Sequence, residues 1–61
     1  MANIKYKHVN YKGFSITLTN YNGKTEIVII SGDNEFIANL AMDIDMAAEW
    51  AKEKIDRGLF N

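Results

Sequence analysis

Apolar and polar residues alternate along much of the chain before residue 42, in the period-two pattern of half-buried β-strands. Residues 14–19 show it most clearly, with apolar side chains on one face and hydroxyl side chains on the other. In residues 25–31, consecutive apolar positions make both faces apolar, which suits a central strand. Residues 35–41 alternate again, although Asn39 is an unusual strand residue. The pattern therefore predicts three strands.

Turn-forming residues separate these segments. Residues 20–24 contain Asn22-Gly23, a pair suited to positive φ, and residues 32–34 form the next turn. The N-terminal segment, residues 1–10, alternates weakly and predicts either a short extra strand or an ordered arm. Gly13 then permits a bulge, a tight bend or a close backbone approach.

After residue 42 the apolar period changes to that of an α-helix. The helix is expected to run from about Asp43 to Arg57, because Asp43 can cap the first turn and Gly58 suits the left-handed position after the last. Asp45 is an alternative cap. One face of this helix is rich in alanine, which allows close approach to a sheet. The residues of that face are Ile44, Ala47, Ala48, Ala51 and Ile55.

Strands followed by one helix indicate the α+β class. We expect a single domain, residues 1–61, formed by a three-stranded antiparallel meander with the C-terminal helix packed on one face. The sheet would be four-stranded if the N-terminal segment also pairs. The helix would cover the face made by Phe14, Ile16, Leu18, Phe36, Ala38 and Leu40, and the opposite face would stay open. Phe60, beyond the helix, is placed to fold back.

Two further sides of the helix offer candidate partner contacts. One carries Met46, Trp50 and Arg57, and the other carries carboxylates that include Glu49 and Glu53. Trp50 has two interpretations: its ring folds over the sheet edge and extends the core, or it anchors a protein partner. These five residues form the candidate partner-binding site.

Composition narrows the possible functions. The chain has 61 residues, no cysteine and a formal net charge of −1, so it has no disulfide, and the cytoplasm is the expected location. No apolar run approaches the roughly 20 residues of a membrane span. His8 is the single histidine, and no metal-binding or phosphate-cradling pattern occurs. We therefore expect no enzyme activity, no catalytic residue, no metal site and no cofactor.

Nucleic acid is the alternative partner. Basic and aromatic residues gather in the N-terminal half, where they offer phosphate contacts and stacking surfaces. The candidates are Lys5, Lys7, Lys12, Lys24, Tyr11 and Tyr21. The net charge of −1 argues against this role, because dedicated nucleic-acid binders usually carry a basic excess.

Two short motifs resemble those of small phage and prophage proteins of strands-then-helix (βββα) form. One is Tyr-x-Gly-aromatic-x-Ile at residues 11–16, and the other is Ala-Lys-x-x-Ile-Asp at residues 51–56. The resemblance implies a phage or mobile-element origin and no particular activity. The layout is also similar, more weakly, to the N-terminal arm-binding domains of phage integrases, which set a three-stranded sheet into DNA. The sheet expected here lacks their basic face.

These observations predict a small protein-interaction module, encoded by a phage or other mobile element, that binds a host or viral protein. They also predict a homodimer or higher oligomer, because a short chain has a small core and one helix covers only one sheet face. The contact would use the open sheet face or an unpaired strand edge. In the rival arrangement the chain is a monomer, and Ile4, Tyr6 and Val9 cover the open face.

Overall fold

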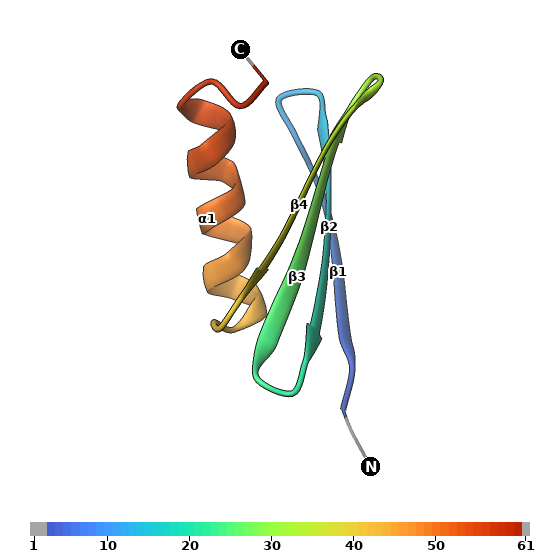
Figure 1. Ribbon diagram of the computed structural model, residues 1–61, viewed down its shortest axis with the longest axis vertical. Coiled ribbons are helices and arrows are strands. Elements are labelled where there is room, and N and C mark those ends of the chain that lie inside the picture. Colours follow the sequence, from blue (N-terminus) through green and yellow to red (C-terminus); the bar gives the residue numbers. More distant parts are fainter. Residues whose placement is uncertain (1–2, 61) are drawn as a thin grey trace.

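The computed structural model, which describes residues 3–60, has one antiparallel sheet and one helix (Figure 1). The sheet has four strands in the order β1-β2-β3-β4, so each strand pairs with its neighbour along the chain. The elements are β1 (Lys5–Tyr11), β2 (Phe14–Tyr21), β3 (Lys24–Ser31), β4 (Asn34–Leu40) and α1 (Ile44–Asp56). This confirms the α+β class, the antiparallel meander and the C-terminal helix. Of the two strand counts considered, four is correct.

β1 is a full edge strand rather than a short addition. It pairs with β2 along its whole length, from Lys5 opposite Asn20 to Tyr11 opposite Phe14. Residues 1 and 2 of the expected N-terminal segment lie outside the described part of the chain. Backbone pairing therefore extends the sheet sideways, with the N-terminal segment lying beside β2.

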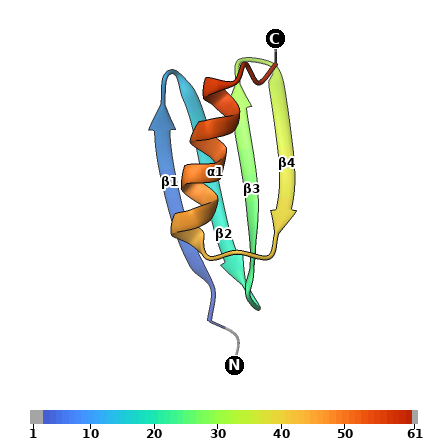
Figure 2. The same cartoon turned by 90° about the vertical axis from the view of Figure 1, so that its left-hand side faces the viewer.

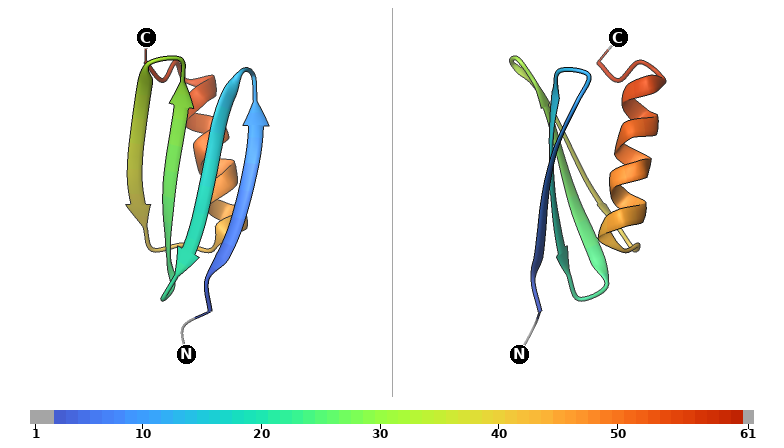
Figure 3. Two further views of the ribbon diagram at one scale, coloured as in Figure 1. Left: turned by 90° about the vertical axis from the view of Figure 1, so that its right-hand side faces the viewer. Right: turned by 180° about the vertical axis from the view of Figure 1, so that it is seen from behind.

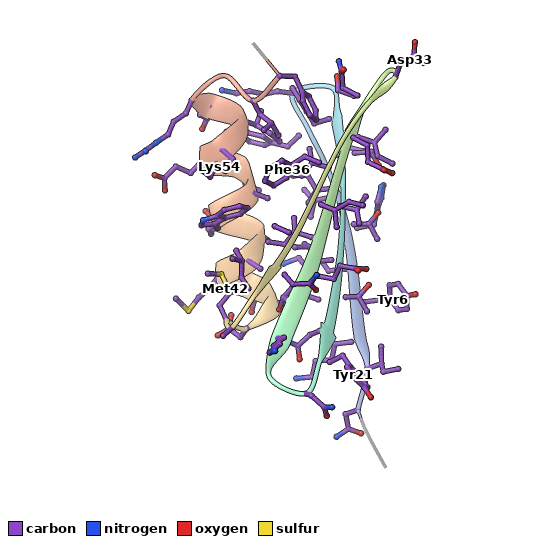
Figure 4. All side chains as sticks on the ribbon, viewed as in Figure 1. Tyr6, Tyr21, Asp33, Phe36, Met42 and Lys54 are labelled. Atoms are coloured by element: carbon purple, nitrogen blue, oxygen red, sulfur yellow. The ribbon has the colours of Figure 1, made fainter. Side chains whose placement is uncertain are left out.

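This position leaves the open face of the sheet without a cover in the described part of the chain. The expectation that Ile4, Tyr6 and Val9 fold across that face is wrong. Tyr6 is 77% exposed and points away from the helix (Figure 4). Val9, by the alternation of the strand, lies on the other face and packs against the core.

The three hairpins are closed by two-residue turns, which fix the register of every strand pair. Lys12-Gly13 has φ values of 51° and 83°, and Asn22-Gly23 has φ values of 52° and 75°. Two successive positive φ values are the mark of the type I′ turn, whose twist matches that of the paired strands. Of the three roles considered for Gly13, the tight bend is the correct one.

The turn expected over residues 20–24 is shorter than its sequence suggests. Asn20 lies inside β2, where it pairs with Thr25 of β3, and its side-chain amide donates to Thr25 Oγ1 over 2.9 Å. Thr25, which is fully buried, in turn donates its hydroxyl to the Met42 carbonyl oxygen over 2.7 Å. These bonds satisfy a buried hydroxyl and tie β3 to the loop that leads into the helix.

The ends of α1 follow the expected capping chemistry. The Asp43 carboxylate accepts a hydrogen bond from the Met46 amide over 2.8 Å, so Asp43 is the cap in preference to Asp45. Arg57 is the C-cap residue of α1, and Gly58, which follows it, has a φ of 92°. Glycine adopts this left-handed conformation without the steric cost of a Cβ.

The core lies between the alanine face of α1 and the sheet. Its buried residues are Ile16, Leu18, Ile27, Ile29, Ala47, Ala48, Ala51 and Ile55. The helix lies across β1, β2 and β3 and leaves β4 beside it (Figure 2). Phe60 folds back as expected and stacks on Phe14, with 6.1 Å between the ring centroids.

Candidate functional site

An apolar groove runs along the side of α1 that faces away from the buried alanines. Met46, which forms part of it, is 60% exposed. The groove has a volume of about 460 Å³ and is lined by Met42, Asp45, Met46, Glu49, Trp50 and Glu53. We call these six residues the helix groove. Four of the five residues predicted as a partner site meet in or beside it, because they recur at helical spacing.

Trp50 forms the wall of the helix groove nearest the sheet. Its ring packs against Phe36 of β4, with 6.2 Å between centroids and a 32° tilt. The Lys54 ammonium lies 5.2 Å from the centroid of the same ring. One side of the Trp50 ring thus extends the core over β4, which was the first of its two interpretations. The ring also lines the helix groove, where it could serve as the partner anchor of the second interpretation.

Arg57 is the exception among the predicted partner residues. It lies outside the helix groove, in a smaller depression of about 120 Å³ that it shares with Trp50, Glu53 and Lys54. Its guanidinium is 2.7 Å from the Glu53 carboxylate. Arg57 therefore orders the end of the groove's acidic rim instead of lining its floor.

The carboxylates of the helix groove are held in exposed ion pairs. Asp45 pairs with Lys7 of β1 at 3.1 Å, and Glu49 pairs with Lys52 at 3.3 Å. Exposed pairs of this kind contribute about 0–1 kcal/mol each, so a partner can replace their cations at little cost. A cationic ligand can therefore take the place of these lysines at the rim of the groove.

The open face of the sheet is the second exposed surface (Figure 3, left). It is largely polar, and its large exposed apolar side chains, Tyr6, Tyr21, Ile30 and Ile37, are distributed over all four strands. Near the β2–β3 turn this face is hollowed to a volume of about 430 Å³. The lining residues are Ile4, Thr19, Tyr21, Asn22, Lys24, Glu26 and Asn39. No charge of one sign dominates them.

His8 and Ser15, which were not predicted to meet, are joined across β1 and β2 by their side chains. The His8 Nε2 atom lies 2.8 Å from the Ser15 hydroxyl on the open face. Pairing of β1 with β2 around the Lys12-Gly13 turn brings them together, and that turn was the available signal. Hydrolytic triads also contain a carboxylate that bonds to the histidine and orients it. In the described part of the chain the His8 ring bonds to no carboxylate.

The six residues considered for nucleic-acid binding are divided between two faces. Lys7 and Lys12 lie on the helix side, where they pair with Asp45 and Asp56 at 3.1 and 2.6 Å. Tyr11 also points to the helix and donates to Asp56. By contrast, Tyr21 and Lys24 line the hollow on the open face. The alternation of β1 places Lys5 with Lys7.

Asp56 links the β1–β2 turn to the end of α1. The Lys12 ammonium and the Tyr11 hydroxyl both bond to its carboxylate. The hydrogen bond from Lys12, followed by that from Tyr11, lowers the pKa of Asp56 below its usual 3.8. The same bond with Asp56 raises the pKa of Lys12 above its usual 10.5.

These pKa shifts predict a small loss of stability at each pH extreme. Because the pKa of Asp56 is lower in the folded state than its usual 3.8, its contribution to stability is fully present above pH 3.8. The contribution is lost as the pH falls through the folded-state pKa. The contribution of Lys12 is present below pH 10.5 and is lost at higher pH. We expect Asp56→Asn to lower the melting temperature at about pH 6 and to leave it nearly unchanged at about pH 2. Thermal melts of both proteins across this range check it, and a difference that is the same at every pH would contradict it.

No protein-family model, curated protein or solved structure matches this chain. Across residues 3–60, none of the helical structure is long and apolar enough to cross a membrane. The same residues contain no cluster of side chains suited to hold a metal ion.

Proposed function

We propose that this chain is a small non-enzymatic protein-binding module that binds a host or viral protein through the helix groove. The observation that carries the proposal is the exposed Met46 beside the partly buried Trp50, bordered by carboxylates on one helix. Met and Trp are enriched at protein interfaces, and an apolar centre with a polar rim is the usual anatomy of such interfaces. The resemblance of two motifs to phage proteins is the ground for proposing a phage or mobile-element origin.

The chemistry of the helix groove defines the kind of partner segment it fits. An apolar side chain would lie between Met46 and Trp50, because this burial removes both from water. Lysine or arginine residues flanking that side chain would pair with Glu49 and Glu53 on the rim. The partner segment is therefore a basic amphipathic one, and a helix would present both features on one side.

Protein is favoured over nucleic acid by the positions of the lysines. Lys7 and Lys12 already pair with carboxylates of α1, and Tyr21 and Lys24 lie on the opposite face of the sheet. Phosphate binding needs several cations on one surface. At the helix groove the carboxylates Asp45, Glu49 and Glu53 stand beside the cations, so a phosphate there would meet charges of both signs.

The proposal is tested with Met46→Glu, a substitution at an exposed position that puts a charge on the floor of the helix groove. The control is Tyr6→Glu, which adds the same charge at an exposed position of the open face. Each protein is immobilised and exposed to host and phage-infected lysate, after circular dichroism has verified its folding. A protein retained by the parent and by Tyr6→Glu is expected to bind Met46→Glu about tenfold more weakly or worse. Equal retention by all three proteins would contradict binding through the helix groove.

A further inference from the structure

The two edges of the sheet are protected to different degrees. Unpaired edge strands invite pairing with other chains, and proteins commonly prevent this with lysine, proline or bulges. β1 carries Lys5 and Lys7, and Lys12 follows it. The seven residues of β4, Asn-Glu-Phe-Ile-Ala-Asn-Leu, include no lysine, arginine or proline. They also pair with β3 residue for residue, without a bulge.

We propose that β4 pairs antiparallel with β4 of a second copy of this chain, with the two-fold axis at Ile37. This inference does not depend on the proposed function, because it concerns the backbone pairing of β4 with a second copy and not the ligand of the helix groove. The two-residue turn at residues 32–33 makes Ser31 and Asn34 a hydrogen-bonded pair, so alternate residues of β4 bond to β3. The backbone N–H and C=O groups of Glu35, Ile37 and Asn39 therefore point outward from the sheet.

Ile37 is the middle residue of β4, and an axis there uses all the outward-pointing groups. Ile37 would bond to Ile37 of the second copy, and Glu35 would bond to Asn39 of the second copy on either side of it. These pairs place a carboxylate opposite a neutral amide. An axis at Glu35 would instead place two carboxylates opposite each other and shorten the overlap, which is unfavourable.

The helix side of the same pairing is also complementary. There, the large Phe36 ring of each copy would lie opposite the small Ala38 of the other copy. These are non-hydrogen-bonded pairs, in which the side chains of an antiparallel sheet lie closest together. Both residues are only partly buried in one chain. α1 lies across β1 to β3 (Figure 2), and the contact that the helix makes with Phe36 comes from the Trp50 ring.

A two-fold axis perpendicular to the sheet joins two four-stranded sheets into one and keeps both helices on the same side. Trp50 packs on Phe36, so the Trp50 side of each helix would face the seam between the copies. The contact area of one strand pair and its side chains is small, so we expect a dissociation constant on the order of micromolar.

The first test measures the mass and the exposed amides of the wild-type chain. Light scattering after size exclusion at about 300 μM is expected to give twice the 6.9 kDa mass of one chain. Hydrogen exchange is expected to slow at the amides of Glu35, Ile37 and Asn39 as the concentration rises. The amides of Phe36 and Ala38 bond to β3 in either state and serve as internal controls. A single-chain mass, or fast exchange at those three amides in the dimer, would overturn the proposal.

The second test uses charge to identify the register. Asn39→Glu places a carboxylate opposite Glu35 of the second copy at two symmetric positions, so the dimer is expected to weaken about tenfold or more. Adding Glu35→Lys to that variant makes both pairs oppositely charged and is expected to restore dimerisation. A double variant as weak as Asn39→Glu would overturn the register.

The matched control is Ile30→Lys, which changes the same open face on the inner strand β3. This substitution leaves the β4 edge intact and is expected to leave the dimer unchanged. Dissociation by Ile30→Lys together with no effect of Asn39→Glu would show that the sheets stack face to face, and the edge pairing would be rejected.

Discussion

Ala51→Glu is expected to unfold a large fraction of the protein at room temperature. Ala51 has no exposed surface and lies where α1 meets β2 and β3. A glutamate there either buries a carboxylate without a cation or forces the helix off the sheet. Removing the partner of a buried charge costs about 3–5 kcal/mol, which indicates the size of the effect. A domain of this length has about 3–9 kcal/mol of stability in total.

Met46→Glu is the control for Ala51→Glu, because it adds the same side chain to the same helix at a position that is 60% exposed. It also lies near the helix N-terminus, where negative charge is favourable. Urea unfolding followed by circular dichroism compares the variants with the parent. A urea midpoint for Ala51→Glu close to that of the parent would mean that the alanine face does not meet the sheet.

The features that sequence predicted well depend on local chemistry. α1 was predictable because its period, its Asp43 cap and its terminal Gly58 all lie within one short stretch. β2 was predictable for the same reason, since alternate residues face the core and the open side. The groove residues Met46 and Trp50 were also found, because helical spacing alone places them on one side.

β1 was harder to predict because its environment is set by distant residues. Its helix-facing positions include Lys7 and Tyr11, which meet carboxylates of α1 instead of apolar side chains. The apolar-polar alternation of a half-buried strand is therefore blurred. Gly13 was the remaining signal in the sequence, because glycine readily adopts the positive φ that a tight hairpin turn requires.

Two other features depend on contacts between residues far apart in the chain. The hydrogen bond from Thr25 to the Met42 carbonyl could not be inferred from turn-like residues around Asn22. The position of α1 over β1 to β3, which leaves β4 only partly covered, follows from side-chain packing across the whole interface. That offset places Trp50 against Phe36 and makes the helix groove reach the sheet edge.

Ile27→Ala is expected to lower the free energy of unfolding by about 2–5 kcal/mol, the usual cost of truncating a buried isoleucine. Ile27 is fully buried in β3, a central strand, and lies between Leu18 and Ala38 in the register. Loss of three carbon atoms there removes contacts with both neighbouring strands and leaves a cavity beneath α1. The sheet cannot easily close the cavity, because backbone pairing on both sides holds β3 in place.

The control for this prediction is Ile30→Ala, which makes the same change on the same strand but on the open face, where Ile30 is 40% exposed. We expect it to cost less than about 1 kcal/mol, since it changes strand propensity and little buried area. Both variants are unfolded in urea at low protein concentration, because self-association would add stability to every variant alike. Equal losses for the two substitutions would mean that both faces of β3 are buried in solution, by a second chain or another cover. A larger loss of unfolding free energy for Ile27→Ala than for Ile30→Ala would place the core on the helix side alone. Only the side chains of that face would then be removed from water on folding.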